Sequence, residues 1–269
     1  MKNKQFIKKA LLSCVAVLFI LSLAACAAPE AQQVAAAPAA TEAPTPAPTA
    51  EPTPEPVVVF TDAALEARVR EAMGKPEGDI TLAEAAAVTK LDLSNTSFDD
   101  MNSKNGGIHD ISDLRYFTGL EDLGLSFNDL HDLSPLSELT SLKYLGFTGI
   151  RADDLSVLKG LTNLVFLGFD WTCQEDARQT GTLSLDFMAD MKNLEIFSCM
   201  GNGVHDISAL GGLTKIWSLY IDDNAITDIS ALANLTNLKE LKLNKNPIAD
   251  YSPLKDIYPN LGFCDIEMP

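Results

Sequence analysis

Residues 216–237, IWSLYIDDNAITDISALANLTN, set the pattern for most of the chain. Aliphatic side chains stand at positions one, four, six, eleven, fourteen, seventeen and twenty of this 22-residue stretch, and Asn224 stands at position nine. The next 22 residues, which begin at Leu238, repeat the arrangement. A unit this short cannot cover its own apolar side, whereas a stack of such units buries a continuous core. The stretch therefore predicts a solenoid.

The unit recurs through residues 88–269 as seven repeats and a final half-repeat, numbered one to eight in chain order. Their first residues are Val88, Leu120, Leu142, Leu164, Leu194, Ile216, Leu238 and Leu261. Repeats one and four are longer than the rest and carry their extra residues in two loops, 98–107 and 173–180, on the same rim of the array. Such loops often bind ligands, but insertions are also tolerated because loop length costs little free energy. Both interpretations stay open.

Each repeat predicts a strand, a turn and a short helical segment. The L-x-x-L-x-L part alternates like a strand, so successive repeats are expected to pair as a parallel sheet. Asparagine at position nine completes the leucine-rich-repeat signature, and its amide is expected to satisfy backbone groups in the turn. Ile150 and Thr172 replace it in repeats three and four. D-[IL]-S-x-L segments predict an outer 3₁₀ turn with serine as its N-cap, and Asp186 replaces this serine in repeat four.

Residues 57–87 predict a helical cap ahead of the array. A first helix is expected to begin at Thr61 or Asp62 and to end at Gly74, with Leu65, Val69 and Met73 along its apolar face. A second short, alanine-rich helix follows a capping-box pair, Thr81 and Glu84. The first repeat of an array exposes apolar side chains unless a cap covers them. The two helices are therefore expected to close this end of the core.

The N-terminus has the layout of a secretory signal, because lysines precede an apolar run over residues 10–23. Leu23, Ala24, Ala25 and Cys26 resemble the lipobox of bacterial lipoproteins, which implies cleavage after residue 25 and a lipidated Cys26. The alternative is an ordinary signal peptide with an incidental cysteine. Residues 1–25 are thus predicted to be the signal. Residues 26–56, rich in alanine, proline and threonine, are predicted to form a disordered tether from the outer face of the cell membrane.

The 22-residue spacing, the D-[IL]-S-x-L segment, and residues 60–74 followed by 77–81 resemble the internalin-type bacterial leucine-rich-repeat proteins. The resemblance extends from about Val57 to the C-terminus. It implies an α/β solenoid: a leucine-rich-repeat horseshoe with a parallel concave β-sheet, short 3₁₀ turns on the convex side and an N-terminal helical cap. It also implies that the concave sheet binds a protein.

Positions three, five and seven of each repeat point away from the core. Tyr144, Phe166 and Ile196 occupy position three of consecutive repeats, and at a strand spacing of about 4.8 Å they would form an exposed apolar stripe. Glycines at position five of repeats two to four are expected to leave a trough of bare backbone beside it. Exposed apolar clusters mark interfaces, and aromatic anchors dominate their energies. The predicted protein-binding residues are Phe127, Tyr144, Phe166, Trp171, Ile196, Trp217 and Tyr220.

Three functions stay open, although lone surface aromatics are ordinary. The favoured hypothesis is a lipid-anchored, monomeric cell-surface protein that binds another protein. The second is a carbohydrate-binding module in which aromatic rings stack on sugars. The third is an envelope spacer without a discrete ligand. The aromatic residues of the second hypothesis are Tyr144, Phe166, Trp217 and Tyr220.

Other classes are disfavoured. A net charge of −17 argues against a nucleic-acid partner, which requires a basic footprint. H-E-x-x-H, G-x-S-x-G and P-loop motifs are absent, so we expect no enzyme and no cofactor. The acidic pairs at 99–100 and 222–223 lack the spacing of a calcium loop and are interpreted as solvated edges. Cys199 and Cys264 fall at core positions, whereas Cys173 is the candidate reactive thiol.

Overall fold

The computed structural model describes residues 55–95, 107–152, 154–172 and 183–267. The predicted signal peptide, Cys26, the tether up to residue 54, Cys173, and all but Gly107 of the two long loops lie outside these ranges. Within them, no helix has the length and apolar character needed to cross a bilayer.

The cap contains the two expected helices. Helix α2 (Ala63–Met73) begins after Asp62, whose carboxylate accepts the backbone N–H groups of Ala64 and Leu65, and ends at Gly74 with a left-handed φ of 63°. Helix α3 (Leu82–Ala87) begins with the predicted capping box, in which the side chains of Thr81 and Glu84 each accept a backbone N–H of the other residue. Both helix starts thus follow from side chains that replace the missing intrahelical acceptors.

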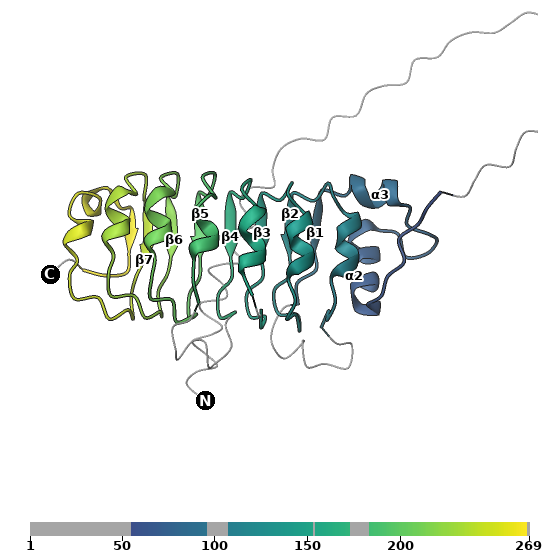
Figure 1. The fold of residues 1–269 in the computed structure, drawn as a ribbon, viewed down its shortest axis with the longest axis horizontal. Helices are drawn as coiled ribbons and strands as arrows, with labels where there is room; N and C mark the ends of the chain where they lie inside the picture. The colour runs from purple at the N-terminus through teal and green to yellow at the C-terminus, as the bar shows by residue number, and fades with distance from the viewer. Residues whose placement is uncertain (1–54, 96–106, 153, 173–182, 268–269) are drawn as a thin grey trace, which may run out of the picture. The chain divides into compact units, whose positions relative to one another are not determined.

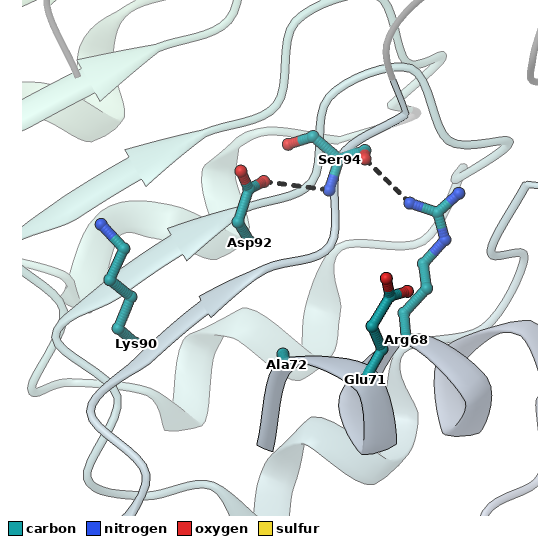
Figure 2. A pocket seen from close by; sticks show the side chains of 6 residues that line it. All are labelled: Arg68, Glu71, Ala72, Lys90, Asp92 and Ser94. Carbon is teal, nitrogen blue, oxygen red and sulfur yellow. Dashed lines mark hydrogen bonds between the residues drawn. The ribbon is translucent and has the colours of Figure 1, made fainter. Parts of the chain in front are cut away.

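Arg68 joins the cap to the first strand. Its guanidinium donates to the carbonyl oxygens of Leu93 (3.2 Å) and Ser94 (2.8 Å), and it also contacts the side-chain oxygen of Asn95. Figure 2 shows the pocket that this arrangement leaves between α2 and the first strand. Its lining residues are Arg68, Glu71, Ala72, Lys90, Asp92 and Ser94.

Eight parallel strands form one sheet whose order in the described part of the chain follows the sequence (Figure 1). Residues at the same repeat position pair throughout, as Leu145 does with Leu167 and Leu167 with Phe197. The extra residues of repeats one and four therefore leave the register unchanged. The strands are β1 (Lys90–Asp92), β2 (Asp122–Gly124), β3 (Tyr144–Gly146), β4 (Phe166–Gly168), β5 (Ile196–Ser198), β6 (Ser218–Tyr220), β7 (Glu240–Lys242) and β8 (Phe263–Cys264).

A 3₁₀ turn follows each of the first seven strands, as predicted, and an eighth precedes β8. The turns stack along the outer side of the sheet (Figure 1). They are η1 (Ser112–Tyr116), η2 (Ser134–Glu138), η3 (Ser156–Gly160), η4 (Asp186–Met188), η5 (Ser208–Gly212), η6 (Ser230–Asn234), η7 (Ser252–Leu254) and η8 (Tyr258–Asn260).

The predicted serine N-cap is wrong. The serine is the first residue of its turn, and the capping acceptor is the aspartate two residues earlier, as in the 2.8 Å bond from the Ser134 N–H to Asp132 Oδ1. This is an Asx turn, which a carboxylate forms with the backbone two residues on. In repeat four the two residue types exchange places, and the Asp186 N–H donates to Ser184 Oγ at 3.1 Å. Asp186 is therefore not a cap either.

The core lies between the sheet and the turns and contains the periodic leucines. In its centre, Phe169 contacts three other phenylalanine rings, with centroid distances of 5.4 Å to Phe147, 5.5 Å to Phe197 and 6.3 Å to Phe187. Cys199 is fully buried beside them, as predicted. Cys264, in contrast, is only half-buried, because β8 is the last strand of the sheet.

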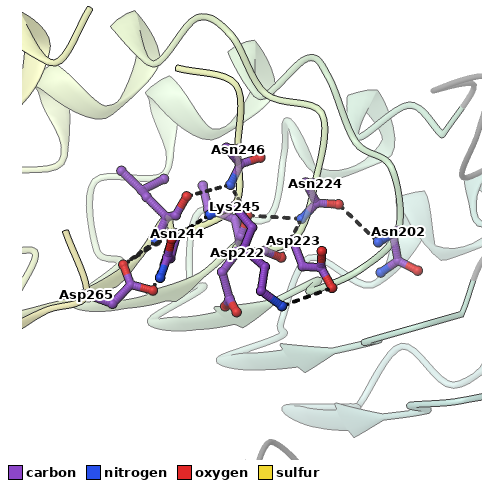
Figure 3. A network of polar contacts seen from close by, with 10 residues as sticks. Asn202, Asp222, Asp223, Asn224, Asn244, Lys245, Asn246 and Asp265 are labelled. Atoms are coloured by element: carbon purple, nitrogen blue, oxygen red, sulfur yellow. Dashed lines mark hydrogen bonds and ion pairs between the residues drawn. The ribbon is translucent and has the colours of Figure 1, made fainter. Parts of the chain in front are cut away.

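The predicted asparagine ladder is present (Figure 3). Asn224 donates through Nδ2 to the carbonyls of Cys199 and Ile221, each at 3.0 Å. Its Oδ1 accepts the N–H groups of Asn202 and Val204, also at 3.0 Å. One side chain thus satisfies four backbone groups in two adjacent repeats. Asn128, Asn202 and Asn246 act in the same manner.

Repeats three and four depart from the ladder as the sequence indicates. Ile150 is buried and offers no polar group. The carbonyl of Phe147, which an asparagine at position 150 would bind, instead accepts the hydroxyl of Thr172 at 3.3 Å. The threonine of repeat four thus compensates for the isoleucine of repeat three.

Candidate functional site

The sheet face consists of the side chains at positions three, five and seven, on the side of the strands away from the 3₁₀ turns. Tyr144, Phe166 and Ile196 lie on it at successive register positions. None of the three belongs to the hydrophobic core, whereas the intervening Leu145 and Leu167 do. The sequence therefore placed this row on the correct side of the sheet and in the correct order.

The predicted exposure of the row is wrong. Phe166 is only 8% exposed and Ile196 only 6% exposed, as is Tyr220 at 8%, while Tyr144 remains half-buried. The prediction of a trough of bare backbone beside the row is also wrong in part, because the Phe166 ring fills the space above the glycines. A Cβ atom on Gly168 would lie 2.9 Å from Phe166 Cζ, and one on Gly146 would lie 3.8 Å from Cε1. The glycines thus provide the space in which the ring lies along the sheet.

Position eight, at the edge of the sheet face, has left-handed backbone geometry in repeats two to seven. Phe127 (φ 58°) and Trp171 (φ 49°) adopt this conformation although it is uncommon for bulky residues. The Trp171 indole lies against Gly201, where a Cβ atom would clash with it. The six residues of this row are Phe127, Gly149, Trp171, Gly201, Asp223 and Lys245. Phe127 is buried, and Trp171, like Trp217 at position two, is half-buried.

Repeats four to seven add hydrogen-bonded polar groups to this face, and of these only Tyr220 was predicted as a site residue. Asp170 Oδ1 accepts the Ser198 hydroxyl and the Met200 N–H, each at 2.7 Å. Glu240 Oε2 accepts the hydroxyls of Ser218 at 2.9 Å and Tyr220 at 2.5 Å. Their outward positions in the repeat were the available signal. The sheet face therefore changes from apolar in its middle to polar and acidic toward the C-terminus.

Asp222 and Asp223 differ, although both were interpreted as a solvated edge. Asp223 pairs with Lys245 at 3.7 Å near the surface, which fits that interpretation. Asp222 points away from the asparagine ladder (Figure 3), and its Oδ1 is buried with no hydrogen-bond partner among the described residues. Burial raises the pKa of Asp222 to about 6, with Lys242 opposing and Asp265 adding to the rise. For Asp222 the interpretation as a solvated edge is wrong.

The remaining candidate clusters have structural explanations. In the pocket of Figure 2, Lys90 pairs with Asp122 at 2.6 Å, and Asp92 accepts the Ser94 N–H at 3.2 Å. Burial raises the pKa of the Cys264 thiol. Across the described ranges, no three histidine, cysteine, aspartate or glutamate side chains are grouped so that they could hold a metal ion.

Comparisons with known proteins agree with this architecture. A family model described as leucine-rich repeats (2 copies) matches residues 218–256. A search of curated proteins returns no match. An internalin (inlF) structure from Listeria monocytogenes is 28% identical with a TM-score of 0.68; the match covers 80% of this chain but only 59% of that protein.

Two further structures resemble the chain. An internalin C2 (inlC2) from Listeria monocytogenes is 29% identical with a TM-score of 0.59, over 81% of this chain and 100% of that one. A leucine-rich-repeat protein from Leptospira interrogans has a TM-score of 0.50 at 20% identity, over 68% of this chain and 51% of that one, and shares the fold alone.

Proposed function

We propose that this chain, which is an internalin-type bacterial leucine-rich-repeat protein, is an interaction module that binds a partner protein on its sheet face. The supporting observation is the register of Tyr144, Phe166 and Ile196, which brings three large side chains from separate repeats into one row outside the core. Large apolar side chains that form a continuous row outside the main core, with Tyr144 partly exposed at one end, are suited to the apolar centre of an interface.

The ring environments favour a protein over a carbohydrate. A sugar stacks on the free face of an aromatic ring, but Phe166 lies against the backbone of Gly168. The ammonium group of Lys242 lies 4.7 Å from the centroid of the Tyr220 ring. Two of the four rings that a carbohydrate would use are thus already engaged. A mixed surface of apolar side chains and hydrogen-bonded carboxylates is suited to a protein partner.

A photo-crosslinking amino acid at position 144 tests the proposal. It would be introduced on the sheet face in place of Tyr144 and, as a matched control, on the outer turn η1 in place of Tyr116; both tyrosines are half-buried. Each variant would be irradiated in the bacterium that produces it and, separately, in the presence of proteins from the bacterium's surroundings. A discrete crosslinked adduct should form from position 144 alone. Equal adducts from both positions, or an adduct from position 116 alone, would reject binding at the sheet face.

We further propose that lipid on Cys26 holds the protein at the outer face of the cell membrane, on the basis of the lipobox-like residues 23–26. Incorporation of a labelled fatty acid should occur in the wild type and be lost in Cys26→Ser, with release of the variant into the medium. Retention of the label by Cys26→Ser would refute the proposal.

A further inference from the structure

We propose that the partner presents a basic side chain, lysine or arginine, to Asp222, beside an apolar side chain that packs on the row of Phe166 and Ile196. This inference rests on the proposed function and specifies its chemistry. It identifies the occupant of the sheet face as a cationic protein segment.

The distribution of charge on the sheet face favours a cationic partner. On the sheet face of repeats six to eight, the carboxylates Asp222, Glu240, Asp265 and Glu267 accompany a single cation, Lys242. The whole chain carries a net charge of −17. A cationic partner is therefore attracted over a distance and an anionic one repelled, because complementary potentials steer association and select partners.

Asp222 differs from its acidic neighbours. Glu240 accepts two hydroxyl groups, and Asp265 accepts the backbone N–H groups of Leu243 (2.8 Å) and Asn244 (3.2 Å). Asp222 Oδ1 is buried and has no such donor among the described residues. A buried charged oxygen without a partner is costly, and native structures rarely retain one without a reason. Asp222 as a whole remains partly exposed, so a lysine or arginine of the partner can approach its carboxylate from the solvent side and form a charge-assisted hydrogen bond.

The position of Asp222 in the sheet also suits such a segment. Asp222 follows β6 at position seven, and its carbonyl accepts the N–H of Gly201 in the neighbouring repeat at 3.2 Å. Met200, at position seven of that repeat, is 2% exposed and lies outside the core, and Ile196 begins its strand. Adjacent strands lie about 4.8 Å apart, so a basic residue and a nearby apolar residue of one partner segment can reach both regions.

A peptide-display selection on the full chain tests the inference. The probe is a library of random twelve-residue peptides, and the selected sequences should carry lysine or arginine close to an aromatic or aliphatic residue. The affinity of a selected peptide should fall at least tenfold in Asp222→Asn and stay within twofold in Asp223→Asn. The two variants change the net charge equally and alter neighbouring residues, but Asp223 pairs with Lys245 at the edge instead of facing the partner.

A second measurement needs no substitution. In the wild type, affinity for a selected peptide should weaken as the pH falls from 7 to 5, because protonation removes the charge of Asp222. The charged groups that act on it are Lys242, which opposes the rise in its pKa, and the carboxylates Asp265 and Asp170, which add to the rise that burial causes. Affinity that is independent of pH in this range would contradict the inference.

The remaining outcomes separate the two proposals. Selected peptides that are acidic or neutral, equal losses in Asp222→Asn and Asp223→Asn, or no enrichment of basic sequences would each overturn the cationic partner. If the acidic or neutral peptides selected in that case still lose affinity in Phe166→Ala, or if the adduct at position 144 is observed, the proposal of binding at the sheet face is retained. If basic peptides are selected but neither Phe166→Ala nor Asp222→Asn affects them, they bind elsewhere, and both proposals fail for these peptides.

Discussion

The two faces of the same strands follow different rules. On the core face, β2, β3, β4 and β6 carry leucine at the same repeat position, and these residues, Leu123, Leu145, Leu167 and Leu219, are at most 1% exposed. On the sheet face the same strands present aspartate, tyrosine, phenylalanine and serine at position three. Successive side chains of a strand point to opposite faces. The alternation thus separates residues that maintain the stack from residues that are free to vary.

The two faces should also differ in how much stability a substitution costs. A side chain removed from the core leaves a cavity enclosed between the sheet and the turns, which adds to the lost transfer free energy. A side chain of the sheet face lies outside that core, so its removal should leave a smaller cavity than a removal between the sheet and the turns. Four predictions test this contrast, beginning with the largest expected effect.

Phe169→Ala should lower the free energy of unfolding by about 3–5 kcal/mol, the range for a buried aromatic residue. Phe169 is fully buried and contacts three other phenylalanine rings, so the cavity cannot collapse easily. Urea unfolding followed by circular dichroism measures the change. A loss under about 1 kcal/mol would mean that the centre of the core is loosely packed.

Asn224→Ala should cost about 2–3 kcal/mol, because four buried backbone groups lose their partner at once. Asn237→Ala is the matched control. Its amide makes one exposed 2.8 Å bond to the Thr214 carbonyl, and the loss should be about 0.5 kcal/mol. Equal losses in the same urea titration would show that the ladder is not a major source of stability.

Phe166→Ala should cost about 1.5–3 kcal/mol, below Phe169→Ala, because its ring is buried against glycine backbone but lies outside the core. The two residues lie three positions apart in one repeat, so the pair compares the two faces within a single strand and turn. A loss as large as that of Phe169→Ala would place Phe166 functionally in the core and remove the basis for a separate binding face.

The smallest predicted effect concerns pH. The folded-state pKa of Asp222 is raised to about 6 from 3.8, so between pH 4 and 6 the folded state binds more protons than the unfolded state. Stability from this group therefore rises as the pH falls through 6 toward 4, by less than about 1 kcal/mol after allowance for partial solvent screening. Asp222→Asn should lack this rise in thermal scans. A wild-type profile identical to that of Asp222→Asn would contradict the assigned environment.

Carboxylates at the outer turns act in the opposite direction and in a lower window. The backbone and hydroxyl groups of Ser208 hold the pKa of Asp206 below its usual value, and those of Ser252 do the same for Asp250. Their contribution is present above pH 3.8 and is lost as the pH falls through their folded-state pKa values. The stability gained from Asp222 as the pH falls and the stability lost from these turn carboxylates should thus occur in separate pH ranges of one stability-versus-pH profile.

Periodicity was sufficient to predict the strands, their parallel pairing and the asparagine ladder, because each depends on spacing, whereas the cap helices were predicted from the capping box of Thr81 and Glu84 and the stop at Gly74. It did not show that Asp132, and not Ser134, accepts the first N–H of its turn, since either residue type can cap. It also could not show how a ring lies within its face. The fit of Phe166 over Gly168 depends on a rotamer. The left-handed row was signalled only by Gly149 and Gly201, which masked its continuation through Phe127 and Trp171.

The most direct test is the affinity of Phe166→Ala for a peptide selected on the wild type, measured at a temperature where both proteins are fully folded. It shows whether the sheet face serves mainly for binding and the core face mainly for stability. We expect at least a tenfold loss of affinity, with the unfolding free energy lowered by only about 1.5–3 kcal/mol. Unchanged affinity, or a loss that follows only the unfolded fraction, would contradict it.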